Sequence, residues 1–550
     1  MIVEPNFGAD HEADDAATPV ESGRRPIDGA RKCAERVEII IKFLRRAKVP
    51  TELLLGDLVA ELYVGRLKYV RERNQFAVWD NRRWRGDSAG DLALAAAQNL
   101  ARMLLRVAAD SEDEDERPRA IEWAMFLSKD RTQRAVLRQA STRLAIDNAD
   151  LDRYPFLLNV LNGTIDLRTG DLRPHNPADL ISKLVPIEYD PNATCPRFLQ
   201  FLDEVFIHKD GGPDTDLVAY MRRFVGYVLT GETSEEVFLI LWGDGENGKS
   251  KFIEVILLIT GEYGITADIA TFAQKRRDGN APSPDIARFA GARFVATTEP
   301  TQGIRLNESF VKTITGRDRI PARFLHQNVF EFSPSFKLTL ATNYKPEIRG
   351  GDHGIWRRVN LVPFLAKFHG ETCDPAIVEK LRAELPGILA WAVRGCIEWR
   401  CVGLRAPPTV TAATNTYREE QSIVRRFVHD ACILMPGAIV QGPRLFEAFQ
   451  KWSANNGERE SLTSRALFTE IRRQFVGAIT DGKSGGQLTF RGIGLRDDRL
   501  DAPVGEESKS VDEVDHRDGD SGFSSSRARE RKPENSSSSS TSSIFDEVRV

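Results

Sequence analysis

Apolar side chains recur at helical spacing in the first part of the chain. Residues 31–70 and 92–109 both show this spacing, and each segment predicts helix. The stretch 76–84 between them reads as a small hairpin with an Asp-Asn turn. The acidic run 110–116 predicts a solvated loop. This part of the chain is therefore expected to be mainly helical.

The pattern changes after residue 158. Short strands with Asn-Gly and Thr-Gly turns are predicted over 158–190, and helix returns over 195–230. From 237 to about 364, strand-like apolar runs alternate with helices, which indicates a βαβ core. We therefore predict the α/β fold class.

The C-terminal part alternates again between helix and strand. Residues 374–400 predict helix, and the Pro407-Pro408 pair marks a joint. Residues 415–497 contain two amphipathic helices, the second of them basic, and close on a β-like segment. A winged helix that sets the basic helix against DNA and a purely structural or protein-contact bundle both fit this pattern.

Composition narrows the class of protein. Of 550 residues, 76 are Lys or Arg and 80 are Asp or Glu, for a formal net charge of −4, and 41% are hydrophobic. No apolar run approaches the roughly 18–20 residues of a membrane-spanning helix, and the first residues lack the order of a signal peptide. We therefore expect no membrane contact. The six cysteines match no zinc or disulfide spacing, so we expect reduced thiols in a cytoplasmic protein. Residues 1–30 and 498–550 predict a disordered leader and tail.

The clearest chemical signal follows the apolar run 237–242. The pattern G-x-x-x-x-G-K-[ST] is filled by Gly243, Asp244, Gly245, Glu246, Asn247, Gly248, Lys249 and Ser250, and Lys251 follows in the helix. A strand, such a loop and a helix form a phosphate-binding loop, in which Lys249 contacts the β and γ phosphates and Ser250 contacts Mg²⁺. A Gly-rich turn before a core helix is the structural alternative. The sequence therefore predicts binding of ATP and Mg²⁺.

Downstream strands end in further polar residues. The run 293–299 ends in Glu299, which could orient water or hold Mg²⁺, although Thr298 stands where many such ATPases have an acid. A second strand ends in Asn343, which could sense the γ-phosphate or simply cap the strand. Arg357 and Arg358 precede a third strand, and either could stabilise a phosphoryl group across a subunit interface.

The order of these motifs resembles the superfamily 3 helicases. It runs from the phosphate loop through Glu299, Lys312-x-x-x-Gly-Arg-Asp, Thr-Asn343 and Trp-Arg-Arg358 to a Pro-Phe strand. It is similar to the helicase region of phage and plasmid primases, which is related to the poxvirus primase-helicase. The resemblance covers about 155–497. It implies an accessory region at 151–230, an AAA+-like core at 231–372, a helical lid or joint at 373–414 and a winged-helix-like domain at 415–497, after a helical region 31–150 of unknown role.

The resemblance also implies a function. It implies an ATP-hydrolysing ring, a homo-hexamer, that moves along single-stranded DNA in phage, prophage or plasmid replication inside a bacterial or host cell. Lys249, Glu299, Asn343 and Arg358, or less favourably Arg357, would be the catalytic residues. A hairpin between Glu299 and Asn343 would enter the channel. Its DNA contacts would be Lys312, Arg323 and His326.

Other assignments remain open at this point. The region before 155 has no strand-borne carboxylate cluster, so we expect either no primase activity in this chain or a separate primase or polymerase partner that supplies it. An ATP-switched replication initiator or scaffold with little turnover is the main alternative, and Thr298 is the residue that favours it. A DNA-packaging motor is less favoured, because no segment with clustered acids follows the core.

Overall fold

The computed structural model describes most of the chain. The described residues are 26–274, 284–298, 304–324, 329–348, 353–457, 462–484 and 486–496. The predicted tail, residues 1–25 of the predicted leader, Glu299 and His326 lie outside them. Helix α1 already begins at Pro26, so the boundary predicted for the leader at residue 30 is wrong.

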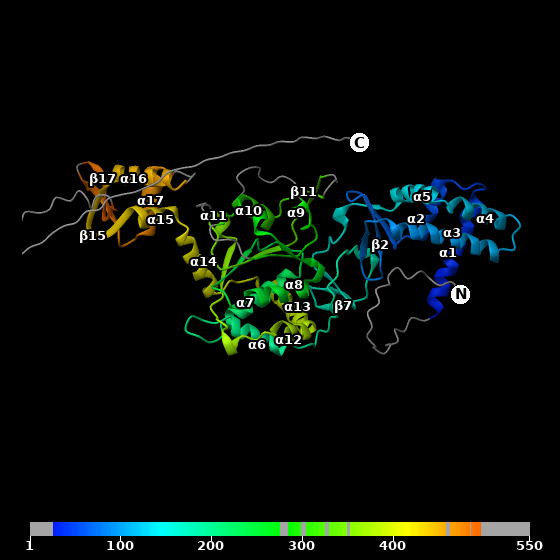
Figure 1. Ribbon diagram of the computed structural model, residues 1–550, viewed down its shortest axis with the longest axis horizontal. Helices are drawn as coiled ribbons and strands as arrows, with labels where there is room; N and C mark the ends of the chain where they lie inside the picture. Colours follow the sequence, from blue (N-terminus) through cyan, green and yellow to red (C-terminus); the bar gives the residue numbers. More distant parts are fainter. Residues whose placement is uncertain are drawn as a thin grey trace, which may run out of the picture. The chain divides into compact units, whose positions relative to one another are not determined.

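The N-terminal region combines helices with a small sheet (Figure 1). Its elements are α1 (Pro26–Arg46), α2 (Glu52–Leu62), β1 (Leu67–Val70), β2 (Gln75–Trp79), β3 (Trp84–Asp87), α3 (Asp91–Asp110), α4 (Glu116–Leu127), α5 (Asp130–Arg143) and β4 (Ala145–Ile146). The strand order is β3-β2-β1-β4. The helix predicted over 31–70 is therefore wrong at its end, where β1 lies, because β1 pairs with β2 and β4. The predicted hairpin over 76–84 is confirmed as β2 and β3.

Helix α3 is the centre of this region. Leu100, Leu104 and Val107 are buried at helical spacing, in a core that α4 and α5 share. Among the described residues, α3 alone has the length and hydropathy of a candidate membrane span. In the structure its apolar stripe packs against protein.

The next segment is a three-stranded antiparallel sheet followed by two helices. The elements are β5 (Leu157–Val160), β6 (Gly163–Asp166), β7 (Asp171–Arg173), α6 (Pro196–Val205) and α7 (Thr215–Val228). The short strands predicted here are confirmed. The predicted helical segment 195–230 is two helices, and α7 begins where the Asp214 carboxylate accepts a hydrogen bond from Leu217 N at 2.9 Å.

A five-stranded parallel sheet forms the centre of the fold. Its strands are β8 (Phe238–Trp242), β9 (Gly264–Ala267), β10 (Phe294–Thr298), β13 (Lys337–Thr342) and β14 (Val359–Pro363), in the order β14-β8-β13-β10-β9. The other elements of this region are α8 (Lys249–Thr260), α9 (Pro284–Ala287), α10 (Glu308–Thr315), β11 (Ile320–Arg323), β12 (Val329–Phe332), α11 (His353–Trp356), α12 (Ile377–Ala383) and α13 (Leu385–Val402). The predicted parallel βαβ core is confirmed.

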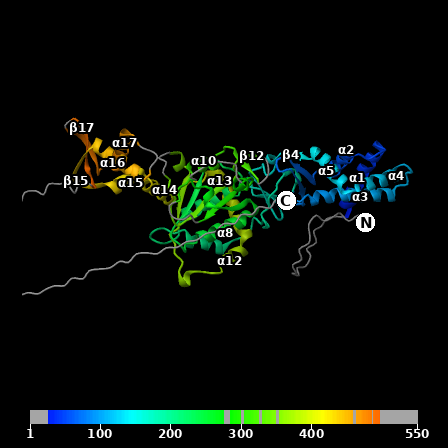
Figure 2. The same ribbon diagram turned by 45° about the horizontal axis from the view of Figure 1, so that its top comes forward.

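Helices cover both faces of this sheet. Leu239 and Leu241 point into a core shared with α7, α8 and α13, whereas Phe238 and Ile240 point into a core shared with α9 and α10. Figure 1 and Figure 2 show α8 and α12 on one side of the sheet and α10 on the other. Strands buried on both faces explain the continuous apolar runs in the sequence.

Helices α7 and α13 approach each other closely. A Cβ on Gly226 would lie 2.0 Å from Cys396 N, and a Cβ on Gly395 would lie 2.2 Å from Arg222 O. At the same contact the Glu398 carboxylate accepts a hydrogen bond from Arg223 Nη1 at 2.8 Å and another from Arg222. The helix pair is therefore held by backbone proximity and by charge.

The last described segment has its own hydrophobic core. Its elements are α14 (Pro408–Glu420), α15 (Ile423–Ala431), β15 (Cys432–Gln441), α16 (Gly442–Asn455), α17 (Ser464–Gln474), β16 (Thr480–Ser484) and β17 (Gln487–Leu495). The sheet is antiparallel, in the order β15-β17-β16. Where two amphipathic helices were predicted within 415–497, the structure has α15, α16 and α17 together with the end of α14, and β15 lies between α15 and α16. Helix α14 runs through the domain boundary predicted between 414 and 415.

Candidate functional site: the Gly-rich loop and its surroundings

The Gly-rich loop joins the end of β8 to the start of α8, as its sequence context predicts. A Cβ on Gly243 would lie 2.3 Å from Phe364 O, so only glycine allows β14 this close. Gly248 has φ +86°, and a Cβ there would lie 2.7 Å from Val205 Cγ2. These two contacts explain why glycine stands at both ends of the motif.

The Lys249 side chain is buried under the loop. Its Nζ donates hydrogen bonds to Gly243 O at 2.6 Å, to Asn247 Oδ1 at 3.0 Å and to Asn343 Oδ1 at 2.9 Å, and Asp244 O lies at 3.3 Å. Lys249 is also the first residue of α8. A lysine that follows a Gly-rich loop at the start of a helix fits an anionic phosphate, because helix N-termini attract anions.

Asn343 reaches this lysine because of strand register. Thr342, the last residue of β13, pairs with Trp242, the last residue of β8, so Asn343 lies beside the first residue of the loop. The Trp242 Nε1–H also donates to Asn343 O at 3.2 Å. The structure therefore brings together two predicted site residues, Lys249 and Asn343.

Asn247 is a further part of this arrangement. It is 3% exposed, its Oδ1 accepts from Lys249, and its Nδ2 donates to Phe364 O at 3.3 Å and to Asp244 O. Its amide thus links the loop, the lysine and the end of β14. The sequence marked Asn247 only as one loop position, because its partner Phe364 is far away in the chain.

The segment after β14 lies along the loop, which the sequence did not predict. Phe368 N donates to Glu246 O at 2.9 Å, Lys367 Nζ lies 3.6 Å from an Asp244 carboxylate oxygen, and His369 Nδ1 lies 2.5 Å from Glu246 Oε2. These two side chains place basic groups beside the two acids of the loop. In the sequence, the one sign of this contact is that two basic residues, Lys367 and His369, follow a predicted strand.

The outer part of the loop faces solvent. Asp244, Gly245 and Glu246 are exposed, as are Ser250 in the first turn of α8 and Lys251, which lies 3.6 Å from Glu254. The exposed Ser250 hydroxyl fits a Mg²⁺ ligand. Thr298 ends β10 opposite Ala341, so the residue after it, Glu299, follows a strand that ends at the same sheet edge. Glu299 itself lies outside the described residues.

Arg357 and Arg358 lie at the amino-terminal ends of the strands, whereas the Gly-rich loop lies at their carboxyl ends. Phe238 N, at the start of β8, donates to Arg358 O at 2.7 Å. The length of β8 therefore separates the Arg358 backbone from the Gly-rich loop of the same chain by on the order of 16 Å.

The two arginines differ in exposure. Arg358 is 8% exposed, with Nη2 2.8 Å from Glu236 Oε2 and Nη1 donating to Gly354 O at 2.8 Å. The Arg357 side chain is 57% exposed and also pairs with Glu236, at 2.9 Å. The sequence did not reveal this shared carboxylate, which lies before β8.

The predicted DNA contacts lie on two different elements. Arg323 is exposed at the end of β11, and β11 pairs with β12 as the predicted hairpin, with Arg323 opposite Val329. Lys312 is half-buried on α10. The tip residue His326 lies outside the described residues. The structure shows the hairpin and leaves its DNA contacts as predictions.

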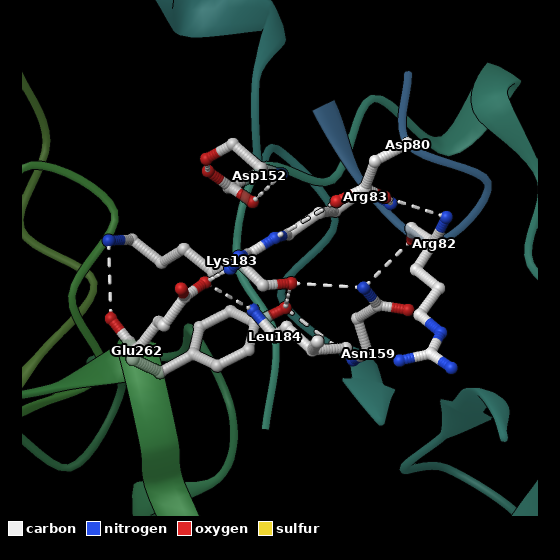
Figure 3. Close-up of polar contacts among 10 residues, drawn as sticks. Asp80, Arg82, Arg83, Asp152, Asn159, Lys183, Leu184 and Glu262 are labelled. Carbon is white, nitrogen blue, oxygen red and sulfur yellow. Dashed lines mark hydrogen bonds and ion pairs between the residues drawn. The ribbon is translucent and has the colours of Figure 1, made fainter. Parts of the chain in front are cut away.

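A polar network connects the N-terminal region to the C-terminal end of α8 (Figure 3). Glu262, just after α8, accepts from Leu184 N at 2.9 Å and pairs with Arg83 from the β2–β3 turn. Asn159 Nδ2 donates to Arg82 O and to Lys183 O, both at 3.0 Å. The hairpin, the β5 sheet and α8 therefore meet at one cluster of hydrogen bonds.

Comparisons with known proteins find similarity over part of the chain. A family profile described as "D5 N terminal like" matches residues 56–207. A "putative helicase" of Acanthamoeba polyphaga mimivirus is 30% identical over 331 residues, which is 56% of this chain and 34% of the relative. A "putative primase" of African swine fever virus is 21% identical over 439 residues, which is 70% of this chain and 43% of the relative.

A solved structure also aligns with the chain. The apo C-terminal region of NrS-1 covers 80% of this chain and 99% of its own, at 10% sequence identity and a TM-score of 0.44. The present chain spans less than half the length of the two viral relatives described above. The D5-type region and the viral matches together show that this chain is related to the viral primase-helicases.

Proposed function

We propose that this protein is an ATP-dependent DNA helicase or translocase of replication, which hydrolyses ATP at the subunit interfaces of a ring. The observation that carries the proposal is the Lys249–Asn343 contact at the carboxyl edge of a parallel sheet. A phosphate loop after one strand and a polar residue after its neighbour are what an ATPase core of the AAA+ type requires. The strand order β14-β8-β13-β10-β9 supports the same core.

Each residue of the site has a proposed role. Lys249 would hold the β and γ phosphates, Ser250 would hold Mg²⁺, and Asn343 would sense the γ-phosphate. Glu299 would orient the attacking water. Bound Mg²⁺ would neutralise charge on the phosphates.

The arginine pair supports a ring. Because Arg357 and Arg358 lie at the sheet edge away from their own loop, a catalytic role requires a neighbouring subunit. A ring in which each subunit supplies an arginine to the next meets this requirement, and a homo-hexamer is the proposed form. Single-stranded DNA would pass the hairpin formed by β11 and β12. A separate primase or polymerase remains a proposed partner.

After α14, the C-terminal segment has the element order helix, strand, two helices and two strands. This order supports a winged-helix domain that contacts DNA. The relatives named as helicase and primase support a role in replication inside the cell that hosts the replicon.

A second function is favoured by one observation. Arg358 is buried and bound to Glu236, so it must leave that pair before it can reach a neighbour. A protein in which this pair persists would bind ATP and DNA without efficient turnover. That behaviour is expected of an ATP-switched initiator or scaffold.

Steady-state ATP hydrolysis with and without single-stranded DNA separates the two functions. A helicase requires DNA-stimulated turnover in an oligomer seen by native mass spectrometry. Arg358→Ala should then assemble and bind ATP but turn over at least about 100-fold more slowly. ATP binding with no stimulated turnover would favour the switch and would exclude the helicase.

A mixing experiment tests whether the arginine acts between subunits. Lys249→Ala subunits can supply the arginine, and Arg358→Ala subunits can supply the loop, so a mixture should hydrolyse ATP faster than either variant alone. The matched control mixes Arg358→Ala with the Lys249→Ala/Arg358→Ala double variant, which supplies neither group. Equal rates in the two mixtures would contradict action across the interface.

A further inference from the structure

A groove of about 980 Å³ separates the basic helix α17 from the end of α14 and from the core. It is lined by Arg305 of the core, Arg418 of α14, Arg425 of α15, and Arg465 and Arg473 of α17. The acidic residues in its lining are Glu419 and Glu470. The lining therefore carries five guanidinium groups and two carboxylates, and it is strongly basic in a chain that is acidic overall.

Two of the arginines are paired with these carboxylates. Arg473 Nη2 lies 2.7 Å from Glu470, and Arg425 Nη2 lies 3.4 Å from Glu419. Arg425 Nε is buried and makes no hydrogen bond within the described part of the chain. Arg305, Arg418 and Arg465 have no carboxylate oxygen within 4.0 Å among the described residues. The positive charge of the groove lining therefore exceeds its negative charge, and the groove can bind an external anion.

The walls of the groove are joined by hydrogen bonds. Ile348 N in the core donates to Gln421 Oε1 at 3.1 Å, and the Ser422 hydroxyl donates to Gln474 Oε1 of α17 at 2.8 Å. The α17 surface that lines the groove consists of Arg465, Ala466, Thr469, Glu470 and Arg473. That surface faces a wall, so it is not free to enter a major groove about 12 Å wide.

The lining also indicates how a ligand would be contacted. Asn415, Ser422, Thr463 and Thr469 add neutral polar groups to the arginines. The one aromatic residue of the lining, Trp356, is 7% exposed and is stacked edge-on against Tyr417, so it offers no platform for a base. Guanidinium and hydroxyl groups without an aromatic platform suit phosphates and sugars.

We propose that this groove binds the sugar–phosphate backbone of single-stranded nucleic acid, independently of sequence. The site is distinct from the β11–β12 hairpin, and it deepens the proposed function, on which it rests for its substrate. Arg305, Arg418 and Arg465 are the principal phosphate contacts. A strand held here would lie between the core and the C-terminal segment, where a duplex does not fit.

Equilibrium binding without nucleotide tests the groove separately from ATP turnover. Fluorescence anisotropy of a labelled oligothymidylate is measured over a salt series from about 50 to 200 mM for the full-length chain. The slope of log K against log salt is negative, and each lost phosphate contact should reduce its magnitude by about 0.7. Arg418→Ala/Arg465→Ala should therefore reduce the magnitude by about 1.4 and weaken binding at least about 10-fold at the lowest salt.

Two matched variants complete the experiment. Arg472→Ala removes the same charge from α17, but Arg472 pairs with Asp481 and does not line the groove, so its slope should stay at the wild-type value. Arg418→Lys/Arg465→Lys keeps both charges and should keep the slope. Circular dichroism melts identify any variant that fails to fold, and Arg305→Ala on the core wall then supplies a second, independent slope.

Three results would overturn the proposal. The first is an unchanged slope in folded Arg418→Ala/Arg465→Ala and Arg305→Ala. The second is an equal loss in Arg472→Ala, which would assign binding to α17 in general. The third is weakened binding of a duplex with unchanged binding of the single strand. A chain that binds the strand through the groove but never hydrolyses ATP would contradict the helicase and leave the groove supported.

Discussion

The ammonium of Lys249 lies 2.9 Å from the amide oxygen of Asn343, although 94 residues separate them in the chain. Parallel pairing of β8 with β13 produces this contact, because both strands end at the same edge of the sheet. The residue that would bind phosphate and the residue that would sense it are thus in direct contact.

Substitution of Asn343 should separate binding from hydrolysis. Asn343→Ala removes a neutral acceptor of Lys249, so ATP affinity should change by less than about threefold, while turnover should fall about 10² to 10³-fold as for loss of one transition-state contact. Asn343→Asp places a carboxylate beside Lys249 and should weaken ATP binding more than alanine does. Titration with a fluorescent ATP analogue and phosphate-release kinetics measure the two effects. Equal loss of affinity and turnover in Asn343→Ala would contradict a sensing role.

The two arginines at Glu236 should differ in their effect on stability. Arg358 is buried, so Arg358→Ala removes its hydrogen bonds to Gly354 O and Glu236 and should destabilise the fold by about 1–2 kcal/mol, because Glu236 is partly exposed and keeps Arg357 as a partner. Arg357→Ala removes an exposed pair and should cost less than about 1 kcal/mol. Urea unfolding measures both, and turnover is measured in parallel. If only Arg357→Ala stops hydrolysis, Arg357 is the arginine that acts in the neighbouring site.

The pairing of Glu398 predicts a pH-dependent stability. Burial acts to raise the pKa of this carboxyl, but hydrogen bonds from Arg223 and Arg222 outweigh it and hold the pKa below its ordinary value. Because the folded-state pKa is the lower one, the stabilisation is present above the unfolded pKa and is lost as pH falls through the folded pKa.

Glu398→Gln should therefore destabilise the protein at neutral pH by about 1–2 kcal/mol, since the group is only partly buried. The difference from wild type should shrink as pH falls below about 4.5. Urea unfolding at a series of pH values measures it. A difference that stays constant with pH would show that the charge of Glu398 does not contribute.

The close contact of α7 and α13 predicts a large effect of one methyl group. Gly226→Ala would put a Cβ 2.0 Å from Cys396 N, which is backbone and cannot rotate away. The helices must separate, so stability should fall by about 3 kcal/mol or more. Gly482→Ala, where nothing lies within 4 Å of the new Cβ, is the control. Thermal melts that coincide for the two variants would contradict the contact.

The buried thiols should be unreactive in the folded protein. Burial raises the pKa of Cys195 to about 11 and that of Cys396 to about 12, so both stay protonated at pH 8. Cys373 and Cys401 are exposed. Iodoacetamide at pH 8 should modify the exposed pair, and should reach the buried pair only after denaturant is added, because the thiolate is the nucleophile. Mass spectrometry of tryptic peptides gives the extent at each site.

The sequence alone determined the elements that depend on local pattern. Apolar runs of strand length, the Gly-rich loop and the strand-end position of Asn343 all follow from residue spacing, because a strand buried on both faces must be apolar and a phosphate loop must be rich in glycine. The order of motifs was enough to indicate the relation to primase-helicases. Local pattern failed at residues 67–70 and 432–441, where pairing with distant strands determines the conformation.

The tertiary structure decided which distant residues meet. Lys367 and His369 lie beside the loop acids, Arg358 pairs with Glu236, and the arginines of α14, α15 and α17 face one groove. No regular spacing of residues in the sequence predicts these contacts, because each depends on how sheets and helices pack. Sequence spacing reports the periodicity of a single element, whereas the site and the groove are formed by side chains from several elements that only the packed fold brings within a few ångströms.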